Sequence, residues 1–175
     1  RRLDALQPVV LSFGRIEGGR AFNVIADRVK LLGTLRCLDT ALYEELPQWV
    51  ESTAQQICRA YGGEATVRFR GIAPPVQNDL ELTRLLEQVA LEQLGRERVL
   101  ELEQPSLGAE DFAHYLGHVP GCMFRLGVAG PEGCAPLHNG AFNPEEACLP
   151  LAVELLSATL RRWLEQHVQQ RGAAL

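Results

Sequence analysis

Two stretches near the beginning of the chain are rich in hydrophobic residues, and hydrophobic and polar positions partly alternate in the second, so we predict two β-strands. Residues 9–16 (VVLSFGRI) form the first stretch, and residues 28–38 (RVKLLGTLRCL) form the second. Between them, the pair Gly18-Gly19 is typical of a turn. We therefore expect the two strands to pair as a hairpin.

Two amphipathic helices are predicted next, over residues 39–61 and from residue 78 or 79 to Gly95. Their apolar residues recur at helical spacing, so each helix has one buried face. Asp39 is a suitable N-cap for the first helix, and glycines follow both helices as stop signals. Pro47 lies inside the first helix and is expected to bend its first turns, because proline lacks the amide hydrogen.

The remaining elements make the second half of the chain alternate between strands and helices. We expect strands at residues 65–70, 99–102 and 122–128, a short helix at 109–116 and a long helix at 144–168. Asn143 would cap the long helix, and Pro144 would occupy its first position. The expected fold class is α+β in the first half and α/β in the second.

Composition and charge narrow the class of protein. With 175 residues, 46% of them hydrophobic, the chain is long enough to bury a core. A net charge of −5 and the lack of a Lys/Arg block argue against nucleic acid as the main partner. No apolar run approaches the roughly 20 residues that span a bilayer. The five cysteines include no C-x-x-C pair, so we expect reduced thiols and a cytoplasmic location.

His138 is the first candidate for chemistry, because it lies in a turn (PLHNGAFNPEEACLP) just before the long predicted helix. One interpretation is a metal ligand at the carboxyl end of a strand. The other is a loop histidine that bonds a backbone carbonyl, and a single histidine does not make a metal site. His114 and His118 are four residues apart but lack the H-E-x-x-H pattern, so we interpret them as structural.

Two further groups of polar residues are candidates for substrate binding. In SLGAEDF, Gly108 permits close backbone approach and Glu110 could bind or transfer a proton, although capping of a helix by Ser106 explains the pattern equally well. Asn23 follows the glycine turn and Arg36 lies 13 residues later in the next strand. A hairpin could bring this amide and guanidinium to one edge, where they would suit a carboxylate, or the two could be ordinary surface residues.

These segments together resemble the C-terminal half of the M20 family of metallopeptidases and amidohydrolases, especially its aminoacylase, hippurate-hydrolase and auxin-conjugate-hydrolase branch. GGRAFNVIADRVKLLGTLRCLD is similar to the segment GG-x-A-x-NVIP-D…GT-x-R-x-LD of that branch. SLGAEDFAHYL is similar to S-M-G-[GA]-EDF-x-x-[YF], and PLHNGAFNPEEACLP to LH-[SN]-P-x-[FY]-x-x-[DE]-x-x-L-x-x-G. Ala26 and Gly140 replace two family prolines. The matches occur in the family's order over almost the whole chain, which makes them more specific than any single motif.

The resemblance implies a domain organisation. Residues 1–75 would be a partial ferredoxin-like lid and dimerisation domain that lacks its first strand and helix. Residues 76–175 would be the C-terminal part of an α/β metallopeptidase catalytic domain, and residues 72–78 would be the hinge. The implied partners are a small N-acyl amino acid or peptide-like substrate and a second copy of the chain, with no nucleic acid and no membrane.

The resemblance also implies roles for five residues. Asn23 and Arg36 would bind the substrate carboxylate, Gly108 would line the cleft with Glu110 nearby, and His138 would be the last ligand of a divalent-metal site (Zn, Mn, Co or Ni). Nothing in the chain matches the family's H-A-C-G-H-D segment or its paired glutamates, so the general base would lie upstream.

We therefore predict that the chain is part of a metal-dependent amidohydrolase that cleaves the amide bond of N-acyl amino acids. We also predict that the chain alone is inactive and binds no metal tightly, since one ligand is present where at least three are expected. The alternative is a non-catalytic dimerisation or binding module built on the lid domain.

Overall fold

A computed structural model describes residue 4 and residues 6–172, which divide into two compact units. The first unit comprises Arg1–Val76 and Gln104–Gly117, and the second comprises Gln77–Glu103 and His118–Leu175. The division after Val76 falls within the predicted hinge. Residues 104–117, however, group with the first unit although the sequence places them in the second half. The interpretation of the two halves as lid and catalytic domain stays a prediction.

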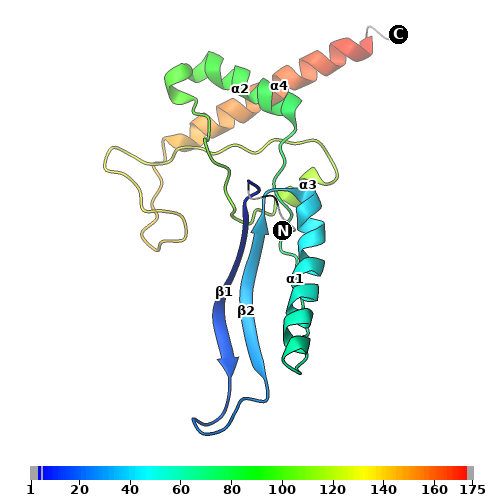
Figure 1. Cartoon of the computed structure of the whole chain (residues 1–175). Helices are drawn as coiled ribbons and strands as arrows, with labels where there is room; N and C mark the ends of the chain where they lie inside the picture. The colour runs from blue at the N-terminus through cyan, green and yellow to red at the C-terminus, as the bar shows by residue number, and fades with distance from the viewer. Residues whose placement is uncertain (1–3, 5, 173–175) are drawn as a thin grey trace. The chain divides into compact units, whose positions relative to one another are not determined.

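A long antiparallel hairpin forms the first unit's sheet, as predicted (Figure 1). It consists of β1 (Val9–Gly18) and β2 (Val29–Cys37), paired from Val9↔Cys37 to Gly18↔Val29. The register shifts between Phe13 and Arg15, which marks a bulge at Gly14. Gly33 pairs with Phe13, and a Cβ atom at this glycine would collide with the carbonyl oxygen of Ser12. The close approach of the two strands therefore requires glycine at position 33.

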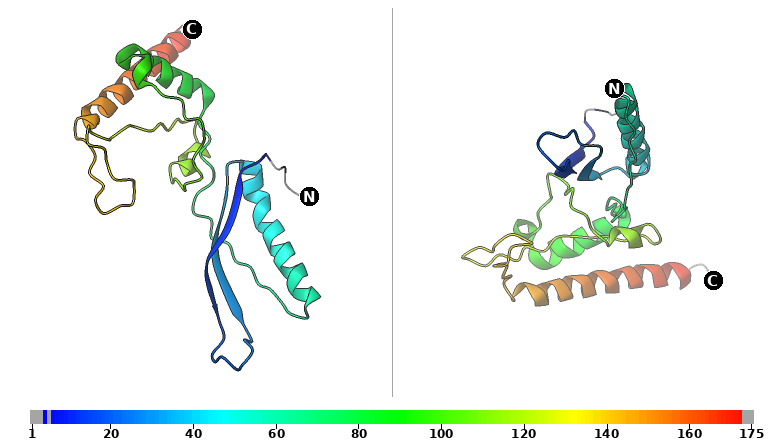
Figure 2. Two further views of the ribbon diagram at one scale, coloured as in Figure 1. Left: turned by 60° about the vertical axis from the view of Figure 1, so that its left-hand side comes forward. Right: turned by 90° about the horizontal axis from the view of Figure 1, so that it is seen from below.

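Helix α1 (Thr40–Ala60) lies alongside the hairpin within the first unit (Figures 1 and 2). The predicted N-cap is confirmed, because the carboxylate of Asp39 accepts a hydrogen bond from the amide of Leu42 at 2.8 Å. Leu42 and Leu46 are the buried residues of its apolar face. Pro47 lies inside α1, which continues through it. The short helix α3 (Ala113–Leu116) starts later than the predicted helix at residues 109–116.

Two helices form the core of the second unit. Helix α2 (Leu80–Leu94) starts at the N-cap Asp79 and ends at Gly95, as predicted, and the short 3₁₀ helix η1 (Arg96–Arg98) follows it. Helix α4 (Cys148–Gly172) lies beside α2 in both figures. The buried residues of this core are Leu86, Val89, Ala90 and Leu155. Arg162 of α4 donates a hydrogen bond to Glu92 of α2 at 2.6 Å and joins the two helices outside the core.

Three predicted strands are wrong: residues 65–70, 99–102 and 122–128 are not strands in the structure. Their composition suits a sheet, but a strand also requires a neighbour that pairs with its backbone. At Met123 a side chain takes that place. The amide group of Asn78 donates to the Met123 carbonyl at 2.8 Å and accepts from the Met123 amide at 2.9 Å. Within the described residues, the hairpin is the only named sheet, so the fold is mixed α and β with a small two-stranded sheet.

The long C-terminal helix begins four residues later than predicted, at Cys148 rather than Pro144. Asn143 is therefore not its N-cap. Pro150 explains the shift, because a helix that began at residue 144 would place this proline in its interior, where its ring collides with the carbonyl four residues earlier. In the observed helix Pro150 lies in the first turn, where an amide hydrogen has no helical acceptor.

The structure has all five cysteines as free thiols. None of the helices in the described part of the chain is long and apolar enough to cross a bilayer.

Candidate functional site

Arg36 and the SLGAEDF segment, two of the predicted site elements, meet in the first unit. Arg36 lies near the end of β2, and its Nη1 donates a hydrogen bond to the carbonyl oxygen of Leu107 at 2.6 Å across 71 residues of sequence. The next residue, Gly108, donates its amide hydrogen to Oγ of Ser106 at 3.0 Å. Arg36 is exposed, and within the described residues its guanidinium makes no other hydrogen bond. Its remaining N–H donors are therefore available to an anion.

Glu110 has a local structural role. Its Oε1 accepts a hydrogen bond from the amide of Phe112 at 3.2 Å, immediately before α3. This bond lies before the helix and does not cap it, because no side chain caps α3, whose cap position is Phe112. An acid or base role of the half-buried Glu110 stays a prediction.

Asn23 and Arg36 are not brought to one edge, so that expectation is wrong. Asn23 lies in the loop that connects β1 to β2, whereas Arg36 pairs with Val10 near the opposite end of the ladder. Arg36 is seven residues beyond Val29, the first residue of β2, and seven residues of strand span about 23 Å. The ladder of a long hairpin therefore keeps the two side chains apart within one chain.

His138 occupies a turn with an uncommon backbone conformation. The amide of Asn139 bonds to the carbonyl of Pro136 at 3.2 Å, and His138 at the third turn position has a φ of 69°. Among the described non-glycine residues it alone has a positive φ. Such a conformation costs on the order of 1 kcal/mol or more for a residue with a Cβ atom. Its imidazole is exposed and makes no hydrogen bond to the described residues.

The loop that carries His138 is held by contacts other than a helix start at Pro144. The amide of Glu145 donates to the carbonyl of Val128 at 2.9 Å, and the thiol of Cys134 donates to the carbonyl of Asn143 at 3.2 Å. These contacts close a loop whose middle contains His138. The loop is therefore anchored at its base, as the functional interpretation of His138 requires.

His114, His167 and Cys37 make contacts within the protein. Nε2 of His114 lies 2.9 Å from the carbonyl of Ile72, and it must be the donor because a carbonyl only accepts. His167 stacks on Trp163 with 4.1 Å between the ring centroids. Burial raises the pKa of the Cys37 thiol, so this neighbour of Arg36 is protonated at neutral pH.

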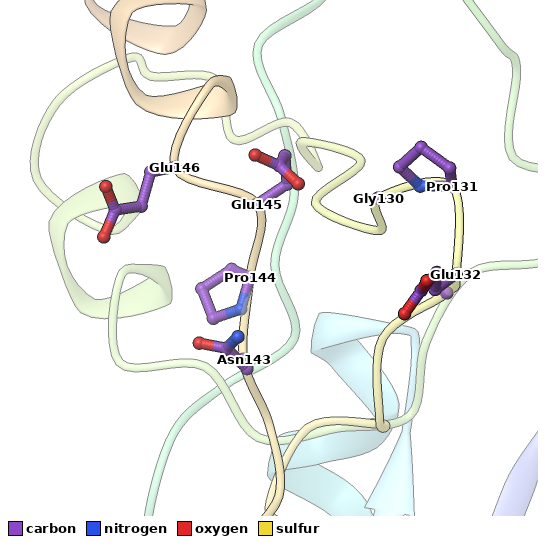
Figure 3. Close-up of a pocket in the computed structure, with 8 residues that line it drawn as sticks. Gly130, Pro131, Glu132, Asn143, Pro144, Glu145 and Glu146 are labelled. Atoms are coloured by element: carbon purple, nitrogen blue, oxygen red, sulfur yellow. The ribbon is translucent and has the colours of Figure 1, made fainter.

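The base of the same loop also contains an acidic cavity that the sequence did not predict. Residues 130–133 and 143–146 line this cavity of about 570 Å³. The carboxylates of Glu132, Glu145 and Glu146 belong to it, as Figure 3 shows. Oε2 of Glu145 lies so close to Gly130 that a Cβ atom there would be 2.8 Å away. The G-P-E-G and N-P-E-E sequences are each recognisable as turns, but their pairing across the loop is a tertiary feature.

The described residues do not by themselves form a metal site. Within residues 4 and 6–172, no group of three or more His, Cys, Asp or Glu side chains is arranged to hold a metal ion. His138 is not among the residues that line the acidic cavity. One imidazole is too few ligands for a divalent metal, which needs at least three from the protein.

The sequence and the fold are similar to those of known hydrolases. The chain is 45% identical to a probable hydrolase of Synechocystis sp. and 30% identical to an N-acetyl-L-cysteine deacetylase of Bacillus subtilis. These matches cover 90% and 98% of this chain but only 40% of each relative. A crystal structure described as a dinuclear metal-binding M20 peptidase from Bacillus subtilis matches with a TM-score of 0.79 at 27% identity, over 90% of this chain and 42% of that one.

The chain thus spans about 40% of the length of the relatives that it matches. A family model agrees with these similarities and with the motifs in the sequence. Residues 5–162, which are most of the chain, match the model of peptidase family M20/M25/M40. The chain is therefore a member of peptidase family M20/M25/M40.

Proposed function

We propose that the chain is part of a metal-dependent amidohydrolase that cleaves the amide bond of N-acyl amino acids, and that it contributes a substrate-carboxylate site. The observation that supports this proposal is the hydrogen bond from the Arg36 guanidinium to the Leu107 carbonyl at 2.6 Å, which leaves the other guanidinium donors available. A forked guanidinium binds a carboxylate through two parallel hydrogen bonds. The similarity to an N-acetyl-L-cysteine deacetylase supports the substrate class.

In this proposal Arg36 binds the free carboxylate of the substrate, and Gly108 lets the acyl amino acid approach the adjacent backbone. Fixing the carboxylate would orient the scissile amide, which lowers the entropic cost of reaction. His138 would contribute one imidazole to a divalent-metal site whose other ligands, together with the general base, lie outside this chain. The described residues do not form this metal site by themselves.

The domain proposal follows from the same family membership. The hairpin and α1 would belong to a lid with a ferredoxin-like fold, and α2 and α4 to the end of the catalytic domain. Exposed apolar residues on α4 support this view, because Leu156, Leu160 and Val168 are each more than half exposed. Apolar surface of this kind normally packs against other protein.

Asn23 can share a carboxylate with Arg36 only if the two residues come from different copies of the chain. About 23 Å of strand separates them in one copy, which is far longer than their side chains. We therefore propose a homodimer through the lid, in which Asn23 serves the partner's site. Sedimentation of the chain should show a dimer, and a monomer at all concentrations would contradict this arrangement.

A non-catalytic dimerisation or binding module is the second candidate, and the same hairpin favours it. Phe13, Ile16 and Leu31 are 52%, 68% and 51% exposed on the strands, where a second copy could cover them. The two candidates differ in their ligand: a binding module of this kind has no requirement for the carboxylate of an N-acyl amino acid.

Titration of the chain with N-acetyl-L-alanine, followed by NMR, tests the proposed carboxylate site. The acid should shift the Arg36 side-chain signal, whereas N-acetyl-L-alaninamide, which lacks the charge, should not. Arg36→Met should abolish the response to the acid. Arg68→Met is the matched control, because Arg68 is an exposed arginine of the same unit. Equal binding of the acid and the amide would contradict the proposed function.

A further inference from the structure

We infer that Ser106 is a positioning residue for Arg36 and that it acts through a single peptide group. Oγ of Ser106 accepts the amide hydrogen of Gly108 at 3.0 Å, and the carbonyl of Leu107 accepts Nη1 of Arg36 at 2.6 Å. This amide hydrogen and this carbonyl belong to the same Leu107–Gly108 peptide unit. Ser106 and Arg36 therefore bond to the N–H and the C=O of the same planar peptide group. The consequence for substrate binding rests on the proposed function.

Planarity makes this coupling direct. The N–H and C=O of a trans peptide point in opposite directions in one rigid plane, so fixing the N–H also fixes the carbonyl. Glycine has the freest backbone, and without the Ser106 bond the plane next to Gly108 could rotate. The carbonyl would then leave the position from which it anchors Arg36. Hydrogen bonds at both ends of a peptide group also strengthen one another.

The structure excludes the simpler capping role for Ser106. Helix α3 begins at Ala113 with Phe112 at the cap position, and no side chain caps it. The amide of Phe112 bonds to Glu110 instead. Ser106 is also exposed, so it does not fill the core. Its hydroxyl acts on the Gly108 amide, and through that peptide on Arg36.

Anchoring of Arg36 matters for binding because a long, flexible side chain loses rotamer freedom when it binds a ligand. The Leu107 carbonyl removes part of this freedom in advance and leaves the other guanidinium donors available. A Ser106→Ala chain should therefore bind a carboxylate about three- to tenfold more weakly, which is the usual effect of losing one hydrogen bond.

The order of the Arg36 side chain in the ligand-free chain is the decisive measurement. In ¹⁵N-labelled full chain, relaxation of the Arg36 Nε–Hε group should report a restrained side chain. Ser106→Ala should make it as mobile as the exposed Arg68, whereas Ser106→Thr, which keeps a hydroxyl acceptor, should restore the wild-type value. Unchanged β1 and β2 amide signals would show that each variant is folded. If Arg36 stays equally restrained in a folded Ser106→Ala chain, the inference is wrong.

A titration with N-acetyl-L-alanine then separates this inference from the proposed function. Ser106→Ala should raise the Kd for the acid three- to tenfold, and Ser106→Thr should leave it within twofold of wild type. If the wild-type chain binds no acid at all, the proposed carboxylate site fails. The relaxation of Arg36 in the free chain still decides whether Ser106 positions it.

Discussion

At the scale of single residues, His138 combines an unfavourable backbone conformation with an exposed imidazole. Its φ of 69° is a conformation in which glycine is free of strain and a Cβ atom is not. Stability alone would favour glycine at this position. The presence of histidine in a strained turn is the kind of outlier that accompanies function.

This strain leads to a prediction that separates the backbone from the imidazole. Both His138→Gly and His138→Ala remove the ring, but only alanine keeps the Cβ atom that the left-handed conformation disfavours. The glycine variant should therefore be more stable than the alanine variant by about 1 kcal/mol. Urea unfolding measures this difference. Equal stabilities, or a more stable alanine variant, would show that the turn is not strained.

At the scale of elements, the hairpin depends on the glycine that faces its bulge. A methyl group at Gly33 would collide with the Ser12 carbonyl, so Gly33→Ala should destabilise the fold by about 1–3 kcal/mol. Gly14→Ala is the matched control. It lies in the bulge of the partner strand, yet a Cβ atom there would have no neighbour within 4 Å. In thermal unfolding, the melting temperature of Gly33→Ala should be well below that of Gly14→Ala. Similar melting temperatures would refute the close approach of the strands.

The pairing of α2 and α4 should depend on pH through Glu92. Its carboxylate accepts hydrogen bonds from Arg162 and Gln88, which lower the pKa of Glu92 below its usual value. A folded-state pKa below the unfolded one stabilises the fold above the unfolded value, roughly pH 4.3, and this contribution is lost as pH falls through the lowered pKa.

Glu92→Gln should therefore lose less stability than wild type when the pH falls from about 5 to 3. Glu87→Gln on the same helix is the control, since Glu87 is exposed and has no hydrogen bond or ion pair within the described residues. Parallel pH profiles of unfolding for wild type and Glu92→Gln would contradict the proposed role of the Glu92–Arg162 pair.

Local signals account for the elements that the sequence predicts well. Asp39 and Asp79 cap their helices through short-range bonds, and Gly95 ends α2, so these boundaries follow from neighbouring residues. The prediction of strands at residues 65–70, 99–102 and 122–128 is wrong because composition does not reveal whether a strand has a neighbour to pair with. Residues 122–128 illustrate this, since the backbone of Met123 bonds to the side chain of Asn78, 45 residues away.

In the candidate site, too, local signals predict some features and not others. Arg36, Gly108 and His138 are recognisable from motifs, but their surroundings are not. The contact between Arg36 and Leu107 spans 71 residues and has no periodic signal. The sequence indicates a hairpin but not its register, so it leaves open whether Asn23 and Arg36 lie at one edge. The length of the ladder separates Asn23 from Arg36.

At the scale of the whole molecule, the proposed function depends on two facts: the family to which the chain belongs and the share of its relatives' length that it covers. The chain belongs to a hydrolase family and spans about 40% of its relatives, and its described residues do not form a metal site. We therefore propose that this chain contributes substrate recognition through Arg36 and one metal ligand, His138, and that the general base lies outside it.

The most direct test uses the protein encoded by the longest open reading frame that contains this chain. Its hydrolysis of N-acetyl amino acids is measured with and without a metal chelator. We predict that the amino acid is released and that its release stops when the metal is removed. Arg36→Met should raise KM at least tenfold and change kcat much less, as expected when a substrate-binding contact is lost. Failure to release any amino acid with added divalent metal, or unaltered kinetics of the Arg36→Met enzyme, would contradict the proposed function.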